Sequence, residues 1–148
     1  MKALIQRVTE ARVMVEGQMV GEIDNGLLVF LGVERGDNEA ATERMVNRLL
    51  AYRIFSDNNG KMNYSVLDVK GSLLVVPQFT LAADTNKGLR PSFTNTANVD
   101  IAENLYLLLL KKIQHIGVHV SAGMFAADMK VHLVNDGPVT FMLETTSN

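Results

Sequence analysis

The run Leu27–Val33 limits the possible folds of this chain more than any other feature of its sequence. Every position in the run is apolar or glycine, so both faces of a strand formed here are apolar and are expected to be buried. Leu73–Val76 has the same character, and it stops at Pro77 because proline cannot donate a hydrogen bond to a β-ladder. Two strands buried on both faces need cover on both faces, which the rest of the chain has to provide.

Further strands are predicted on both sides of these two runs. They are recognised by alternating β-branched residues and by bounding turns rich in Asn, Asp and Gly. The expected strands and turns are Ala3–Val15, the turn Glu16–Gln18, Met19–Ile23, the turn Asp24–Gly26, and two closing strands, Met129–Val134 and Val139–Leu143, joined by Asn135–Pro138.

Two segments change to a helical period. The first runs from Glu39 to about Tyr52, after cap-forming residues at Gly36–Asn38. The second begins near Asp100 and Glu103, which are spaced as in a capping box, and Gly117 is expected to end it. Its predicted buried stripe consists of Ile101, Leu105, Leu108, Leu109, Ile113 and Ile116.

The order of these segments predicts an α+β fold with a single domain over residues 1–148. We expect an antiparallel or mixed sheet that curls into a barrel-like form over two packed helices. Ala82–Asn98 lacks a clear period and is expected to be a long ordered loop, and Thr145–Asn148 a frayed tail. Neither a signal peptide nor a membrane-spanning run is visible, so we expect a cytoplasmic protein without a membrane partner.

The composition excludes several kinds of site. The chain has no cysteine, which rules out a disulfide framework, a thiolate zinc site and a cysteine nucleophile. Its histidines, His115, His119 and His132, are too scattered to suggest a metal cluster, so neither a metal nor a cofactor is expected. A net charge of −2 argues against a protein that grips a long stretch of nucleic acid, but it allows a small contact with one nucleotide end.

Three polar segments are candidates for function. Gln78, Phe79 and Thr80 follow directly on a buried strand, where they form either a functional group or a strand cap with Phe79 in the core. Asn135–Thr140 is either a hairpin turn or a site at which Gly137 lets the main chain approach a ligand. The loop Ala82–Phe93 is either a solvated connection or an anion contact made by its cations, Lys87 and Arg90.

Taken together, these segments resemble the D-aminoacyl-tRNA deacylase family, whose members hydrolyse D-amino acids from tRNA. The resemblance runs from Met1 to about Leu143, nearly the whole chain. Each motif is weak by itself, but all of them occur in the family's order. They are Ala3–Val8, Tyr52–Asp57, Gln78–Thr85, Gly88–Phe93, Phe125–Met129 and Asn135–Thr140.

The resemblance implies a homodimer of small barrel-like subunits with active sites at the subunit interface. Gly137 and Pro138 would form a cis-proline element that one subunit inserts into the pocket of the other, flanked by Asn135, Val139 and Thr140. Its carbonyl groups would meet the α-amino group of the substrate and leave no room for an L side chain, whereas glycine would pass. The resemblance also implies that Arg7 holds this element in orientation.

The other wall of the implied site is Gln78, Phe79 and Thr80, whose backbone amides would polarise the ester carbonyl. In the favoured mechanism the 2′-OH of the terminal ribose assists water, and a covalent role for Thr80 is the rival mechanism. Phe125 and Met129 are candidates either for the adenosine pocket or for core packing. Lys87 and Arg90, with Lys130, are candidates for contacts with tRNA phosphates.

The chain departs from the family pattern at two positions. Pro77 replaces a common serine before Gln78, which removes that hydroxyl, stiffens the loop and is also a feature of a sister class with relaxed chirality. Phe79 and the intact Asn135–Thr140 motif favour the D-specific class. Met142 replaces a frequent aromatic residue, for which we expect only a repacked core. A non-catalytic protein that binds an RNA end or a small ligand on the same barrel is the alternative from another functional class.

Overall fold

β1 (Lys2–Val15) is the strand on which the sheet is built. The computed structural model describes residues 1–148, and in it β3 (Gly26–Gly32) pairs with the first half of β1 and β2 (Gln18–Ile23) with the second half. β8 (Lys130–Glu144) pairs with β1 along nearly its whole length on the other side. All three of these pairings are antiparallel.

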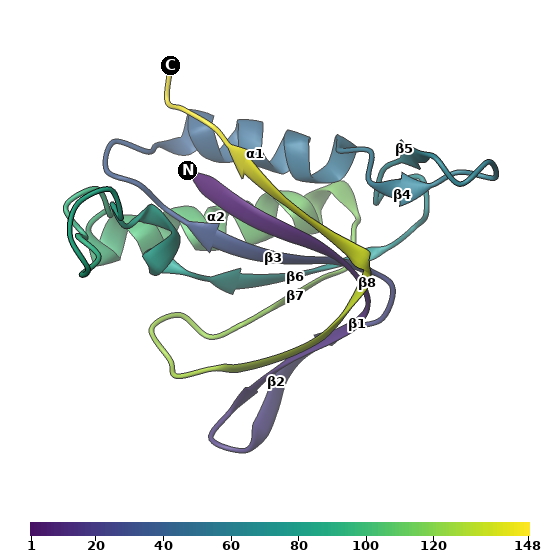
Figure 1. The fold of residues 1–148 in the computed structure, drawn as a ribbon, viewed down its shortest axis with the longest axis horizontal. Helices are drawn as coiled ribbons and strands as arrows, with labels where there is room; N and C mark the ends of the chain where they lie inside the picture. Colours follow the sequence, from purple (N-terminus) through teal and green to yellow (C-terminus); the bar gives the residue numbers. More distant parts are fainter.

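The sheet is mixed and nearly closed (Figure 1). β6 (Ser72–Pro77) lies parallel to β3, and β7 (Val120–Ala122) lies parallel to β6. β7 in turn approaches β2, where the Ser121 hydroxyl donates to the Glu22 carbonyl at 2.9 Å. A Cβ atom on Gly21 would lie 2.5 Å from the Ala122 carbonyl oxygen, so glycine is what permits this approach. The expected barrel-like α+β fold is confirmed.

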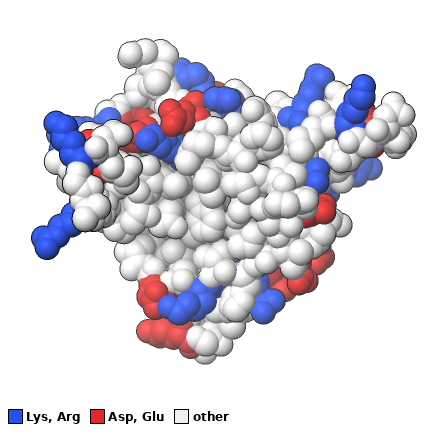
Figure 2. Space-filling view, in the orientation of Figure 1, with Lys and Arg blue, Asp and Glu red and all other residues white.

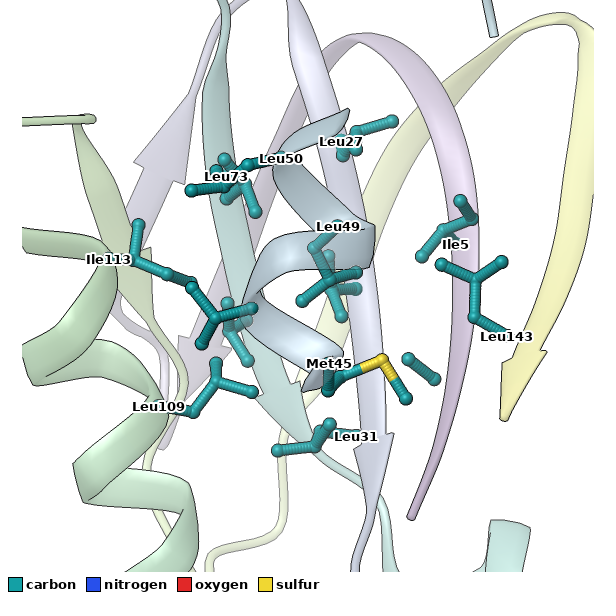
Figure 3. Packing of buried hydrophobic residues seen from close by; sticks show 14 of the residues in the cluster. Ile5, Leu27, Leu31, Met45, Leu49, Leu50, Leu73, Leu109, Ile113 and Leu143 are labelled. Carbon is teal, nitrogen blue, oxygen red and sulfur yellow. The ribbon is translucent and has the colours of Figure 1, made fainter. Parts of the chain in front are cut away.

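Two helices, α1 (Glu39–Ala51) and α2 (Val99–Ile116), cover one face of the sheet (Figure 1). Figure 3 shows Met45, Leu49, Leu109 and Ile113 pointing from these helices into the core that contains Leu31. Residues of β3 alternate between this core and a second cluster inside the curled half of the sheet. Burial of Leu27–Val33 on both faces is therefore confirmed.

The helix ends follow local chemistry, with one correction. Asn38 caps α1 by accepting from the Ala41 amide at 3.1 Å, and Gly117 ends α2 in the left-handed region at φ 95°. The predicted capping box at Asp100 is wrong, because the N-cap of α2 is Asn98, whose side chain accepts from the Asp100 amide at 3.0 Å. Asn98 has the extended ψ of 144° that a cap requires, whereas Asp100 already lies within the helix.

The predicted stripe of α2 is only partly correct. Leu109 and Ile113 are buried, but Ile101 and Ile116, near the two ends of the helix, are exposed. The most buried residue that the stripe omitted is Tyr106, which is 2% exposed. The helix contacts the sheet mainly through its middle turns, so apolar residues near its ends remain at the surface.

The C-terminal part of the chain differs most from expectation. Residues 129–143 do not form a hairpin, because both predicted closing strands belong to the single strand β8, which continues along β1. The tail does not fray at Thr145, which is 7% exposed and exchanges hydrogen bonds with Met1. The Met1 ammonium also lies 2.8 Å from Glu34 and from Asp37, which ties the first strand to the loop before α1.

The remaining elements are short. β4 (Phe55–Ser56) and β5 (Met62–Tyr64) form a small separate sheet around the predicted turn Ser56–Gly60, beside the end of α1 (Figure 1). A 3-10 helix, η1 (Phe79–Ala82), follows β6. The loop Ala82–Asn98 is ordered, with Asp84 and Ser92 exchanging backbone hydrogen bonds of 2.8 and 2.9 Å. No helix has the length and apolar character that crossing a membrane requires.

Candidate active site

The end of β6 presents Gln78, Phe79 and Thr80 at the surface. The Gln78 amide donates to the Leu31 carbonyl at 2.8 Å, which fixes this segment to the end of β3. The Gln78 side chain donates to the Thr80 hydroxyl at 2.6 Å. Phe79 is 61% exposed, so the reading in which it belongs to the core is wrong. Three functional groups thus lie together on a short turn that these hydrogen bonds fix to the end of β3.

The first backbone amides of η1 are available to a ligand. The first N–H groups of a helix have no acceptor within that helix. Neither Phe79 nor Thr80 donates its N–H in any of the turn, loop or side-chain hydrogen bonds of the structure. Paired, fixed N–H groups of this kind can stabilise negative charge that develops on a carbonyl oxygen.

A cavity of about 670 Å³ opens beside this turn, and most of its lining is hydrophobic. Gln78 and Phe79 form one side, and Phe125 and Met129 form another, so the structure brings these four predicted residues together. Its volume lies within the range of about 300–1,000 Å³ that is usual for small-molecule sites. The cavity therefore suits a largely apolar or aromatic group.

The prediction missed several residues that line this cavity. Phe93 belongs to the polar loop, and its ring centroid lies 5.3 Å from that of Phe79. An aromatic residue at the end of a polar loop was the available signal for it. Ala97, Val99 and Ala102 also line the cavity, and small aliphatic residues of this kind carry no functional signal in a sequence.

Tyr106 packs behind one wall of the cavity, against Phe125. Its hydroxyl donates to the Val75 carbonyl at 3.0 Å, and its ring centroid lies 6.0 Å from that of Phe125. Burial raises the pKa of this phenol well above its usual value, so the group stays neutral and keeps its donor proton. Tyr106 thereby joins α2 to the end of β6 and to the wall that contains Phe125.

The Gly137–Pro138 segment forms a bulge in β8. Val8 pairs with Asn135 and Gln6 with Thr140, so the four residues 136–139 face a single residue of β1. Asn135 closes the base of this bulge: its side-chain oxygen accepts from the Val139 amide, and its side-chain nitrogen donates to the Thr140 hydroxyl, both at 2.9 Å. The Gly137–Pro138 peptide bond is cis.

Arg7 is the residue of β1 that faces the bulge. Its Nε donates to the Asp136 carbonyl at 3.0 Å, and one terminal nitrogen donates to the Ile54 carbonyl at 2.8 Å. The Asp136 carboxylate lies 3.6 Å from the same Nε. These contacts hold the main chain just before Gly137.

The two parts of the predicted site lie apart within the chain. Arg7 pairs with Leu27 at the start of β3, whereas Gln78 is bonded to Leu31 near the end of β3. Four residues of strand correspond to about 13 Å. Gly137 and its neighbours are consequently at one end of the sheet, and the cavity is at the other.

The three predicted cations are all exposed. Lys87 and Arg90 are exposed in the loop that follows η1, on the cavity side of the molecule. Lys130 instead pairs with Asp128 at 3.0 Å. No group of three or more His, Cys, Asp or Glu side chains is arranged to hold a metal ion.

The fold is that of two solved structures. The chain matches the c-Myc DNA Unwinding Element Binding Protein with a TM-score of 0.93 and 38% identity, over 99% of this chain and 100% of the other. It also matches a structure titled as a probable eukaryotic D-amino acid tRNA deacylase, with a TM-score of 0.75 and 16% identity, over 97% and 98% of the two chains. The second likeness concerns the fold alone.

The family is shown by sequence. The model of the D-Tyr-tRNA(Tyr) deacylase family matches residues 4–144. A D-aminoacyl-tRNA deacylase of Pectobacterium atrosepticum is 55% identical over 98% of this chain and 100% of its own length. Another, of Aeromonas hydrophila, is 58% identical over 97% and 99% of the two chains. The chain belongs to the D-Tyr-tRNA(Tyr) deacylase family, a family of hydrolases.

Proposed function

We propose that this protein hydrolyses the ester bond between a D-amino acid and the 3′-terminal adenosine of tRNA, and so returns free tRNA to translation in the cytoplasm. Family membership supports the reaction class. The apolar cavity beside Gln78 and Phe79 supports the proposal that the terminal adenosine binds there, because an adenine base stacks against aromatic and aliphatic surface. Phe125, Met129 and Phe93 provide this surface.

The observation that carries the proposal is the separation of the two half-sites. Gly137–Pro138 is exposed at one end of β3, and the cavity with its free amides is at the other end. A single subunit cannot bring them to one substrate. In a homodimer related by a two-fold axis, the bulge of one subunit reaches the cavity of its partner, and two equivalent sites result.

The surface of the sheet supports such a dimer. In Figure 2 the central face of the molecule carries almost no Lys, Arg, Asp or Glu, and the charged side chains lie around its margin. β8 also exposes Val134 and Met142, by 48% and 44%. Depletion of charge at the centre with a charged rim is typical of a protein interface. Met142 is thus a surface residue in the subunit, and the expectation that it is repacked within the core is wrong.

Selection for the D configuration would come from main-chain atoms. The carbonyl groups around Gly137 and Pro138 accept the substrate α-amino group, and an L side chain collides with the bulge while a D side chain points away. Glycine has no side chain and passes. Because main-chain atoms supply the contacts, Arg7, Asn135, Val139 and Thr140 act by fixing the shape of the bulge.

The chemistry would rest on positioning. The Phe79 and Thr80 amides stabilise the negative charge on the ester oxygen, and the 2′-OH of the terminal ribose assists the attacking water. The Thr80 hydroxyl accepts a hydrogen bond from Gln78, and neither a carboxylate nor a histidine is hydrogen-bonded to it. Thr80 therefore lacks the base that would make it a nucleophile. Lys87 and Arg90, both exposed in the loop after η1, would contact the phosphates next to the terminal adenosine.

The direct test measures amino acid release from D-Tyr-tRNA, L-Tyr-tRNA and Gly-tRNA. We expect rapid release from the D substrate, slower release from glycine, and release from the L substrate at the rate of buffer alone. Equal release from the D and L substrates would contradict chiral selection and indicate the relaxed class. No release from any substrate would contradict the enzyme and leave a protein that binds an RNA end.

Subunit mixing tests whether each site is shared. A bulge variant, Gly137→Val, and a cavity variant, Phe79→Ala, should each be nearly inactive as homodimers. After co-refolding of equal amounts, half of the dimers are mixed, and each of these has one intact site, so about one quarter of wild-type activity should return. Recovery of no activity, with mixed dimers demonstrated by differential tags, would contradict a site built from two subunits.

A further inference from the structure

The segment from Arg53 to Lys70, which contains β4 and β5, supplies no side chain to the reaction proposed above. It carries three exposed cations, Arg53, Lys61 and Lys70. None of them lies within 4 Å of a carboxylate oxygen, whereas Lys2, Arg7, Lys112 and Lys130 each pair with one. In Figure 2 the Lys and Arg side chains gather at the upper right, over β4 and β5.

The two carboxylates of this segment are turned towards their own backbone. Asp57 accepts from the Lys61 and Asn59 amides at 3.0 and 2.8 Å, and these bonds lower its pKa. Asp68 accepts from the amide and hydroxyl of Ser65, which lower its pKa in the same way, with a smaller attraction from Arg53. The carboxylates shape the turns, and the three cations stay exposed, with only Arg53 donating a side-chain hydrogen bond, to the Asn63 side-chain oxygen at 3.4 Å.

Both ends of this segment are fixed beside the Gly137–Pro138 bulge. At one end, the Ile54 carbonyl accepts from Arg7, which also holds the Asp136 carbonyl. At the other end, Gly71 packs against Gly26, with the position of a Cβ on Gly71 only 3.2 Å from the Gly26 Cα atom. Gly26 pairs with Val8, and Val8 pairs with Asn135 at the base of the bulge. The cations and the bulge thus belong to the same end of the sheet.

We propose that Arg53, Lys61 and Lys70 form a binding surface for the phosphodiester backbone of the tRNA acceptor stem. The inference rests on the proposed function, because the bulge of each subunit is there placed against the 3′ end of the substrate. The stem that continues from this end carries closely spaced negative charges, and exposed, unpaired Arg and Lys side chains attract them without reading sequence. The surface would let a chain of net charge −2 bind RNA, because three of its exposed cations without a carboxylate partner lie beside the substrate.

The test compares two substrates and two triple variants. The substrates are D-Tyr-tRNA and the short ester D-tyrosyl-adenosine, which lacks the stem. The test variant is Arg53→Gln, Lys61→Gln and Lys70→Gln. The control variant, Arg12→Gln, Arg35→Gln and Lys111→Gln, removes the same charge from exposed residues that also lack a carboxylate partner. For each, kcat/KM is measured between 50 and 200 mM salt.

Loss of three phosphate contacts should make the plot of log kcat/KM against log salt concentration shallower by about 2–3 for D-Tyr-tRNA. Wild type and the control variant should therefore lose about 20- to 40-fold more activity than the test variant over this salt range. All three proteins should hydrolyse D-tyrosyl-adenosine equally.

Two results would overturn the inference. The first is a salt slope on D-Tyr-tRNA that is the same for the test variant and wild type. The second is a loss of kcat/KM by the test variant that is as large on D-tyrosyl-adenosine as on D-Tyr-tRNA, which would reveal a damaged active site. Failure of wild type on both substrates would instead contradict the proposed function, and the inference would fall with it.

Discussion

Replacement of Gly137 by alanine tests the geometry of the bulge most directly. Gly137 has a φ of 141°, in the region that side chains with a Cβ atom rarely adopt. A Cβ atom there would lie 2.6 Å from the Cγ2 atom of Val139 and 3.2 Å from a terminal nitrogen of Arg7. Val139 is 6% exposed, so its methyl group is packed and cannot swing away freely.

The size of the effect follows from these contacts. Carbon atoms normally approach to about 3.5–4.0 Å, so residue 137 or Val139 has to move by about 1 Å. A displacement of about 1 Å in a positioning group costs about 10²-fold in rate, which corresponds to about 2.7 kcal/mol. The unfavourable φ adds about 1–2 kcal/mol to the cost of folding, which lowers Tm by about 2–8 °C.

Gly17→Ala is the matched control. Gly17 lies in the turn between β1 and β2 with a φ of 77°, and a Cβ atom there would meet nothing within 4 Å. We expect both variants to lower Tm, and only Gly137→Ala to reduce kcat/KM for D-Tyr-tRNA by about 10²-fold. The reasoning is refuted if Gly137→Ala keeps kcat/KM within about threefold of wild type while its Tm falls like that of the control.

Two further substitutions address the cavity. Thr80→Ala should keep kcat within about tenfold of wild type, because the structure gives this hydroxyl no base; a loss of about 10⁴-fold in single-turnover assays would restore the covalent mechanism. Tyr106→Phe should lower the free energy of unfolding by about 1 kcal/mol, since the Val75 carbonyl loses one of its two donors and keeps the Gly123 amide at 3.0 Å. The raised pKa of Tyr106 favours the neutral phenol in the folded state, so the stability of wild type should decline as pH rises above about 10. Urea titrations at pH 8–11 should show a flatter profile for Tyr106→Phe, and parallel profiles would argue against this assignment.

Much of the candidate site could be predicted because it lies next to strong local signals. Pro77 marks the end of a buried strand, and the polar residues after it were expected at the surface. Phe79 and Phe125 could be placed in one site only through the family resemblance, and the structure brings them to the same cavity. Phe93 was missed as a site residue, because its contact with Phe79 depends on how the intervening loop folds back.

The sequence by itself determined the local elements. The unbroken apolar run at Leu27–Val33 predicts a strand covered on both faces, because all of its side chains avoid water. Gly117 predicts the end of a helix, because glycine adopts the left-handed conformation that a helix end often requires. The absence of cysteine likewise settles from composition alone which chemistries are closed to the chain.

Only the tertiary structure decided what Asn135–Thr140 does. A turn motif between two apolar runs is compatible with a hairpin, but pairing with β1 on both sides of the motif makes it a bulge within one strand. The same register places Gly137 at the start of β3 and the cavity at its end. Strand register is a property of residues far apart in the chain, so no local pattern could reveal that the two parts of the predicted site lie apart within one chain.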